Sequence, residues 1–348
     1  MRRGIGFLIF VAVLCVSLVG CKSSDYKKAV DFQNAEDYAA AAELFGQLGE
    51  YKDATDRLQE CNNVISYNEA SELLANKDYE SAAALFETLG SFRDSSERLS
   101  ECNAMIEAIQ EFEAATEALT GKNQELDAAV TAANDIVISE DKALNEELRP
   151  TVETAISDAK SKRMEIPTQP ETADEIKSAA EEMNGIDYAD VLESLQEQQT
   201  ALERSIQQYA LVNEPSESYV IQCLETVPGI TGISAATEDN DPNNGLGKDG
   251  SYTAAVYFSH ENVDQSTVYG DTIIEKGTDG GGQIEVYRTE EDAIRRRDYL
   301  SAFDGSMFAS GSHTVIGTVL IRTSNNLTAS QQNQLEADII AALTNLDS

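Results

Sequence analysis

The chain has no tryptophan, only two histidines and few basic side chains among its 348 residues. Its 25 Lys and Arg residues stand against 62 Asp and Glu residues, so the formal net charge is −37. Nucleic acids and anionic lipid surfaces are bound through Lys and Arg side chains that neutralise phosphate. The composition therefore argues against nucleic acid as a partner and against a membrane contact made through a basic patch.

Cysteine is scarce, and its spacing is not that of a metal site or a disulfide framework. Cys15 lies in an N-terminal apolar run and Cys21 directly follows that run. The cysteines that remain are Cys61, Cys102 and Cys223. An odd number without CxxC spacing, with only His260 and His313 to assist, argues against both a structural zinc site and a disulfide framework.

Long apolar runs are absent except at the N-terminus. Arg2 and Arg3 precede an apolar run from Ile5 to Val19, which is shorter than the ~20 residues that a transmembrane helix needs. The run leads into a small residue and a cysteine, in the order Leu18, Val19, Gly20 and Cys21. This arrangement is typical of a bacterial secretory signal in its lipoprotein form.

These four residues resemble the lipobox of bacterial lipoproteins. The resemblance implies that residues 1–20 are a signal peptide, that cleavage precedes Cys21, and that the Cys21 sulfur carries a covalent diacylglycerol, with palmitate among the expected acyl chains. Acyl chains contribute ~0.8 kcal/mol per buried methylene, so two or more would hold the protein at a membrane without basic residues. The expected location is the extracytoplasmic face of the cell membrane. The alternative is a short transmembrane anchor with an incidental cysteine.

Residues 21–105 contain an internal repeat with a period of 41 residues. Matching segments include Asp37-Tyr38 with Asp78-Tyr79, Leu44-Phe45 with Leu85-Phe86, and Glu60-Cys61-Asn62 with Glu101-Cys102-Asn103. A repeat of this length predicts stacked supersecondary units. Each unit has the pattern of a helical hairpin, with a long helix whose start at Asp94 and Glu97 is spaced like a capping box, and a shorter helix that ends at Gly90.

The hairpins resemble tetratricopeptide repeats. The residues that carry the resemblance are Ala70, Leu73, Asp78, Tyr79, Ala82 and Phe86. The match ends after Leu89, so the two copies are divergent, and the following segment is expected to cap them. Cys61 and Cys102 are equivalent positions of adjacent hairpins, ~8 to 10 Å apart. A disulfide requires Cα atoms within ~7 Å, so both are expected to be small buried apolar residues.

Residues 106–213 keep a helical pattern and lose the repeat. One helix is expected to stop at Gly121, and Pro167 and Pro170 interrupt the later pattern. Further apolar stripes cover residues 126–137, 144–159, 172–183 and 191–209. The prediction is a helical bundle or coiled coil that acts as a spacer or presents its stripes to a partner helix.

Residues 214–348 contain 13 of the 21 glycines and several β-branched runs. Strands are expected near 230–237, 252–259, 283–288 and 314–323, with helices near 217–227, 290–303 and 328–346. This pattern predicts an α+β domain with a mostly antiparallel sheet. The stretches 237–243, 246–248, 252–253, 284–287 and 292–293 resemble a module found at the C-terminal end of lipoproteins from Gram-positive bacteria. That family has no established activity, so the resemblance implies a location and an architecture.

The residues most suggestive of a ligand site are Asp239, Asp241 and Asn243, which have the 1, 3, 5 spacing of a calcium loop. The pattern fails where Asn244 replaces the required glycine and Gly250 replaces the closing glutamate. The alternative is a loop in which Asx side chains bond to the backbone, and the sequence favours this alternative.

Other candidate sites are weaker. His313 has no evident nucleophile or carboxylate partner in the sequence, and no Gly-x-Ser-x-Gly motif is present. The cluster Arg295-Arg296-Arg297 is expected to pair with local acids such as Glu291 and Asp292.

The expected fold is mostly α, with helical-hairpin repeats and a bundle or coiled coil followed by a C-terminal α+β domain. The leading functional hypothesis is a lipid-anchored extracytoplasmic adaptor that binds another protein or an envelope component at the cell surface. The alternative is a small-ligand or calcium-binding module carried by residues 214–348. We expect no enzymatic activity, since the sequence carries no recognisable catalytic motif.

Overall fold

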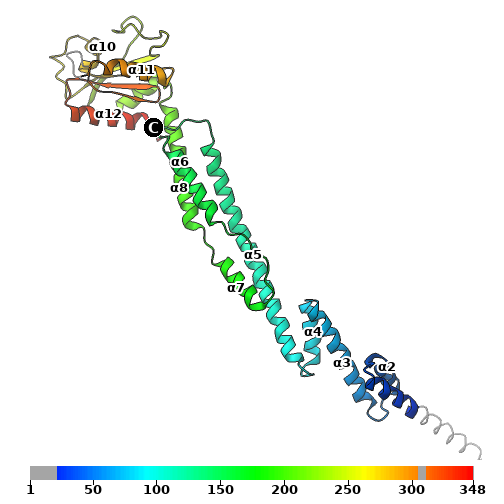
Figure 1. Ribbon diagram of the computed structural model, residues 1–348. Coiled ribbons are helices and arrows are strands. Elements are labelled where there is room, and N and C mark those ends of the chain that lie inside the picture. The colour runs from blue at the N-terminus through cyan, green and yellow to red at the C-terminus, as the bar shows by residue number, and fades with distance from the viewer. Residues whose placement is uncertain (1–21, 305–310, 348) are drawn as a thin grey trace, which may run out of the picture. The chain divides into compact units, whose positions relative to one another are not determined.

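The computed structural model describes residues 22–304 and 311–347 (Figure 1). The expected lipidation motif, Leu18 to Cys21, lies outside these residues. The chain divides into two compact units, one formed by residues up to 123 together with 164–187, and the other by 124–163 together with 188–348. The predicted fold class, mostly α with a C-terminal α+β domain, is confirmed. Within the described ranges, no helix combines the length and apolar character needed to cross a membrane.

The first unit is built from helices, and its repeated hairpins are as predicted. After a helix at residues 22–34 come α2 (Tyr38–Leu48), α3 (Ala54–Ala75), α4 (Tyr79–Leu89), the first part of α5 (Ser95–Val137) and α7 (Ala173–Asn184). Phe45 and Cys61 are buried in the core of the first hairpin, and Phe86 and Cys102 in the core of the second. Both cysteines are free thiols, which confirms their predicted apolar role.

The predicted capping role of Asp94 is wrong. Its carboxylate instead accepts a hydrogen bond from the Tyr67 hydroxyl at 2.5 Å and another from Arg98 Nε at 2.9 Å. These two bonds lower the pKa of Asp94. The first repeat has the same arrangement at the equivalent residues Tyr26, Asp53 and Arg57. The aspartate therefore joins the start of one helix to the preceding long helix, which a local sequence motif does not indicate.

Gly121 does not end a helix, because α5 continues through it from Ser95 to Val137. A glycine inside a helix costs about 1 kcal/mol relative to alanine. Leu119 and Leu126, on either side of Gly121, are fully buried. Burying one leucine side chain contributes about 1.5–3 kcal/mol, so packing on both sides outweighs the cost of the glycine.

The second unit contains α6 (Leu148–Lys162) packed against α8 (Ala189–Leu211), and the α+β domain. The elements of that domain are α9 (Glu217–Glu225), β1 (Ile230–Ala235), β2 (Ala254–His260), α10 (Ile273–Lys276), a 3-10 turn (Gly277–Gly280), β3 (Gly281–Val286), α11 (Glu290–Ser301), β4 (His313–Ile316), β5 (Val319–Thr323) and α12 (Ala329–Leu343). The expected single strand over 314–323 is a hairpin instead. Gly317, at φ +55°, opens its turn, and a Cβ there would lie 2.5 Å from the Val212 carbonyl oxygen.

The five strands form an antiparallel sheet in the order β1-β2-β3-β5-β4, whose two faces differ in chemistry. One face is apolar, with Phe258, Ile284 and Ile321 buried against α9 and α12. The other face carries polar side chains beneath α11, which lies on the opposite side of the sheet from α12 (Figure 1). The polar face and the open strand β4 therefore set the positions of the candidate sites.

Candidate functional site

The calcium-like loop is organised around one buried carboxylate. Asp239 and Asn243 are exposed, whereas Asp241 is 9% exposed. The two carboxylate oxygens of Asp241 accept hydrogen bonds from the backbone N–H groups of Asn243, Gly245 and Leu246 and from the hydroxyl of Tyr252, at 2.6–3.1 Å. Burial alone would raise the pKa of Asp241, but these donors lower it overall. The carboxylate is therefore directed at donors of the loop itself.

In the part of the chain that the structure describes, no group of three or more His, Cys, Asp and Glu side chains is placed to hold a metal ion. Tyr252 is buried beneath the loop, and burial together with its bond to Asp241 raises the pKa of its hydroxyl. The hydroxyl therefore stays protonated and remains a donor to Asp241. Of the three residues of the calcium-like spacing, only Asp241 is buried, and both of its oxygens already accept hydrogen bonds from the loop and from Tyr252.

His313 has two partners that the sequence did not indicate. Its Nε2 lies 2.9 Å from Ser301 Oγ and 3.4 Å from Asp304 Oδ2. A catalytic triad needs the serine and the carboxylate on opposite nitrogens of the imidazole. Ser301 also donates its hydroxyl proton to the Arg297 carbonyl oxygen at 3.0 Å, so it accepts from Nε2. This polarity is the reverse of what a general base requires.

A row of polar side chains crosses the sheet beneath α11. The strand register places Tyr257 beside Gln283, Gln283 beside Arg322, and Arg322 beside His313. Cross-strand neighbours on one face lie about 4.5–5.5 Å apart at Cβ, so the side chains of this row are in reach of one another. Arg322 Nη1 donates to Gln283 Oε1 at 2.9 Å.

Glu285 is the buried carboxylate at the centre of this face. It accepts hydrogen bonds from Arg322 Nη1 at 3.1 Å and from the Tyr287 hydroxyl at 2.6 Å, and Arg296 Nε lies 3.4 Å away. Burial would lower the pKa of Arg296, but Glu285 raises it overall, so the guanidinium remains charged.

The predicted pairing of the arginine cluster is therefore only partly right. Arg295 pairs with Asp292, as predicted, and Arg297 pairs with Asp298. Arg296 turns inward to Glu285. The sequence did contain one sign of this inward pairing, since Glu285 stands between Ile284 and Val286 in a predicted strand. In the structure every residue of that strand is buried.

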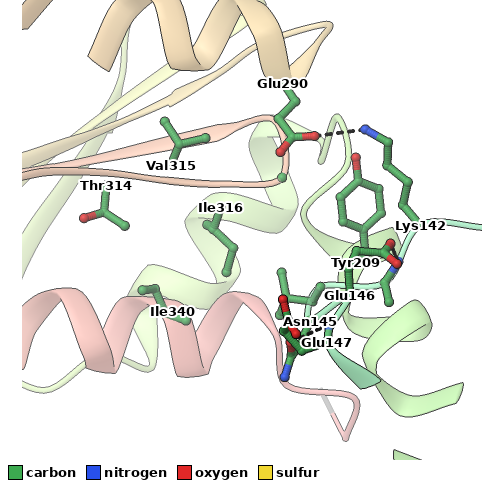
Figure 2. Close-up of a pocket in the computed structure, with 13 residues that line it drawn as sticks. Lys142, Asn145, Glu146, Glu147, Tyr209, Glu290, Thr314, Val315, Ile316 and Ile340 are labelled. Carbon is green, nitrogen blue, oxygen red and sulfur yellow. Dashed lines mark hydrogen bonds and ion pairs between the residues drawn. The ribbon is translucent and has the colours of Figure 1, made fainter. Parts of the chain in front are cut away.

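A pocket of about 710 Å³ lies beside β4, entirely within the second unit, and we refer to it as the edge groove (Figure 2). It is lined by residues 142–147, Tyr209, Glu290, residues 314–317 and Ile340. Figure 2 shows Lys142 reaching across to Glu290, with the Tyr209 ring beside the ammonium group. Lys142 Nζ is 3.0 Å from Glu290 Oε2 and 5.7 Å from the centre of the Tyr209 ring.

The wall opposite β4 is held by α8. Ser205, which is 4% exposed, accepts the backbone N–H of Leu144 with its carbonyl oxygen at 3.0 Å and that of Asn145 with its hydroxyl at 2.8 Å. Arg149 binds the carbonyl oxygens of Ile136 and Val137 at the end of α5. The segment that forms this wall is therefore fixed at both ends by hydrogen bonds.

Strand β4 is an edge strand, and the edge groove lies along its open side. The two-residue turn makes Ile316 and Val319 a pair that exchanges both backbone hydrogen bonds, and such pairs alternate along an antiparallel ladder. Thr323 N–H donates to the Ser312 carbonyl oxygen at 3.1 Å, in keeping with this alternation. The N–H and C=O of Val315 therefore point away from β5. Neither has a backbone partner within residues 22–304 and 311–347.

Comparison of the chain with protein-family models, with curated proteins and with solved structures gave no match. The interpretation of the edge groove therefore depends on its own geometry.

Proposed function

We propose that this chain is a lipid-anchored extracytoplasmic adaptor, which binds an extended segment of a partner protein in the edge groove. The resemblance of residues 18–21 to a lipobox supports the anchor, and the expected location is the cell surface. The observation that carries the binding function is the open edge of β4, with the outward backbone groups of Val315. The repeated hairpins of residues 21–105, which resemble tetratricopeptide repeats, support a role in protein binding.

An open edge can accept an additional strand because its unpaired N–H and C=O groups match those of an extended peptide. Backbone hydrogen bonds then supply affinity, and pockets for alternate side chains supply specificity. In the edge groove the apolar lining includes Leu144, Val315 and Ile316 of β4, and Ile340 of α12. A partner residue whose side chain points toward α12 would contact Ile316 and Ile340, while its neighbours along the added strand would point away from α12.

The charges around the edge groove define the partner further. Glu147 is exposed and has no side-chain partner in the described ranges, and Glu290 already binds Lys142. The chain as a whole carries a formal charge of −37. Complementary charge accelerates association and excludes like-charged partners. The partner segment should therefore alternate apolar residues with Lys or Arg.

Photocrosslinking in the cells that produce the protein tests this proposal. A benzophenone amino acid at Glu147 should capture one defined protein, through a peptide that is extended and basic when mapped by mass spectrometry. The same group at Glu153, which is exposed on α6, is the matched control and should not capture it. Equal capture from both positions, or a crosslinked peptide without basic residues, would contradict the proposal.

The edge itself is tested by Val315→Pro with Val315→Thr as its control. Proline removes the outward N–H of residue 315 but leaves the hydrogen bonds of Thr314 and Ile316 to β5 in place. Threonine keeps the N–H and the β-branched shape. We expect Val315→Pro to abolish the Glu147 crosslink and Val315→Thr to retain it. Retention in both, with native circular dichroism spectra, would show that the edge does not bind the partner.

A further inference from the structure

A second pocket of about 330 Å³ lies between α11 and the loop that follows β1, and we refer to it as the arginine cleft. Its lining includes Asn243, Tyr252, Tyr287, Arg295, Arg296 and Tyr299. It shares no lining residue with the edge groove. It is therefore a separate candidate site, and its test is independent of the partner proposed above.

Arg296, which lines the arginine cleft, shares its acid with a second arginine. The carboxylate of Glu285 is shared between Arg322 and Arg296, so two buried or half-buried guanidinium groups face one acid. Arg295, by contrast, has its own acid in Asp292. In the described part of the chain, Arg296 has no other ion pair, and its Nη1 and Nη2 atoms donate no hydrogen bond. Arg296 therefore lies at the cleft with only part of its hydrogen-bonding capacity used.

A charge removed from water is costly unless it is paired and hydrogen-bonded. Arg296 Nε is buried without a hydrogen-bond partner, and the side chain as a whole is 23% exposed, which leaves the guanidinium open on the cleft side. A carboxylate matches a guanidinium through two parallel N–H···O bonds. A single carboxylate would therefore supply the acceptors that the open side of Arg296 lacks.

The walls of the arginine cleft indicate which chemical group of the ligand would lie beside the carboxylate. The Tyr252 and Tyr287 hydroxyls are already bound to Asp241 and Glu285, and their rings meet edge to face at 6.1 Å. Both side chains are 2% exposed, so they form the floor of the cleft and offer no free hydroxyl. Tyr299, 57% exposed, stands beside Arg296 with its ring centre 5.5 Å from Cζ. Aromatic walls of this kind favour an apolar or aromatic group in the ligand.

We propose that the arginine cleft binds the carboxylate of an apolar or aromatic acid, with Arg296 as the residue that recognises the carboxylate. The carboxylate could be that of a free small acid or the C-terminus of a peptide, since both present the same group.

The test uses the chain from residue 22 onward, labelled with nitrogen-15 at arginine, and follows the Nε–H signals in solution. Benzoate is the probe, benzamide is the uncharged control of the same shape, and inorganic phosphate is the doubly charged control. Benzoate should shift the Arg296 signal saturably, benzamide should not, and phosphate should bind at least tenfold more weakly. A shift of equal size with benzamide, or tighter binding of phosphate, would overturn the proposal.

Matched variants on α11 locate the site. Arg296→Lys keeps the charge but loses the forked geometry, and it should weaken benzoate at least tenfold, as measured by calorimetry. Arg297→Lys, on the same helix and paired with the exposed Asp298, should have no effect. Tyr299→Ala changes an exposed side chain that the fold does not need, so it serves if Arg296→Lys fails to fold, and it should weaken benzoate several-fold. Equal affinity in all three variants would place binding elsewhere.

Two further probes separate the sources of the carboxylate. A short peptide that ends in phenylalanine with a free carboxylate should displace benzoate if the natural ligand is a chain terminus, and its amidated form should not. Displacement by benzoic acid derivatives but not by the peptide assigns a free small acid. Displacement by the amidated peptide would contradict carboxylate recognition altogether.

Discussion

Replacing Glu285 with glutamine should strongly destabilise the α+β domain, because it removes the acid that two arginines share. The glutamine has nearly the same shape as the glutamate, so packing is retained while the negative charge is lost. Glu285 is fully buried, and its oxygens contact Arg322, Arg296 and Tyr287. The substitution leaves two guanidinium groups facing each other without an acid between them.

The expected size follows from the burial of these charges. Breaking a buried ion pair by removing one partner costs about 3–5 kcal/mol, because the remaining charge is uncompensated. Glutamine retains one acceptor oxygen for Arg322 or Tyr287, which places the expected loss near the lower limit, at about 3 kcal/mol. For a domain of this size, 1 kcal/mol corresponds to about 3–5 °C, so the midpoint of unfolding should fall by about 10 °C.

Differential scanning calorimetry of the chain from residue 22 onward provides the measurement, because it separates the transitions of the two units. Near-ultraviolet circular dichroism identifies the affected transition, since Tyr252, Tyr257 and Tyr287 are buried in this domain and the chain has no tryptophan. Glu291→Gln is the matched control, because Glu291 is exposed on α11 and has no ion pair in the described ranges. It should change stability by less than about 0.5 kcal/mol.

A second substitution tests the cause. In the Glu285→Gln background, Arg296→Met removes one of the two unpaired charges and should restore part of the lost stability, whereas in the wild-type chain it should destabilise. The two signs define a coupling between Glu285 and Arg296. If Glu285→Gln and Glu291→Gln unfold within about 2 °C of each other, the stability difference is well under 1 kcal/mol. That result would show that the charge of Glu285 does not stabilise the two buried guanidinium groups.

Three further predictions concern other buried groups. Burial lowers the pKa of His260, so its neutral form is the folded one, and stability should be retained above about pH 6.5 and fall below it; the midpoint of His260→Gln should lose this dependence, whereas that of His313→Gln should keep it. Tyr252→Phe leaves Asp241 without its side-chain donor and should cost about 1.5–3 kcal/mol in urea unfolding, with the difference disappearing as pH falls through the lowered pKa of Asp241; equal stabilities at neutral pH would refute this. Burial raises the pKa values of Cys61, Cys102 and Cys223, so a thiol reagent at neutral pH should modify none of them in the native chain and all three in urea.

The repeat was predictable because two segments of the sequence, 41 residues apart, carry matching residues. The 41-residue spacing aligned Cys61 with Cys102 and Phe45 with Phe86, and in the structure each pair occupies equivalent positions in the hairpin cores. Local capping rules were less reliable. They placed Asp94 correctly at the start of a helix but assigned its carboxylate to the cap, whereas its partner Tyr67 is 27 residues earlier and belongs to α3. A long-range bond of this kind has no local signature.

The candidate sites were less predictable than the fold. The sequence indicated a sheet and several of its strands, but it did not specify which strand is at the edge, because strand order depends on contacts between distant segments. The edge groove combines residues near 145 with residues near 315, so no motif could indicate it. Arg296 was expected to pair with local acids such as Glu291 and Asp292, and only the position of β3 beneath α11 brings Glu285 within 3.4 Å of it.

The polar face of the sheet carries an energetic cost that the apolar face does not. Buried nitrogen atoms without a hydrogen-bond partner include Gln283 Nε2, Arg296 Nε, His313 Nδ1 and Arg322 Nε, all of them on this face. Each such atom costs about 1–3 kcal/mol, and apolar side chains of similar volume would remove that cost. The opposite face of the sheet avoids this cost, because its buried side chains include the apolar Phe258, Ile284 and Ile321. Departures from good packing are expected at functional sites. Of these residues Arg296 lines the arginine cleft, where a bound carboxylate would supply acceptors to its guanidinium.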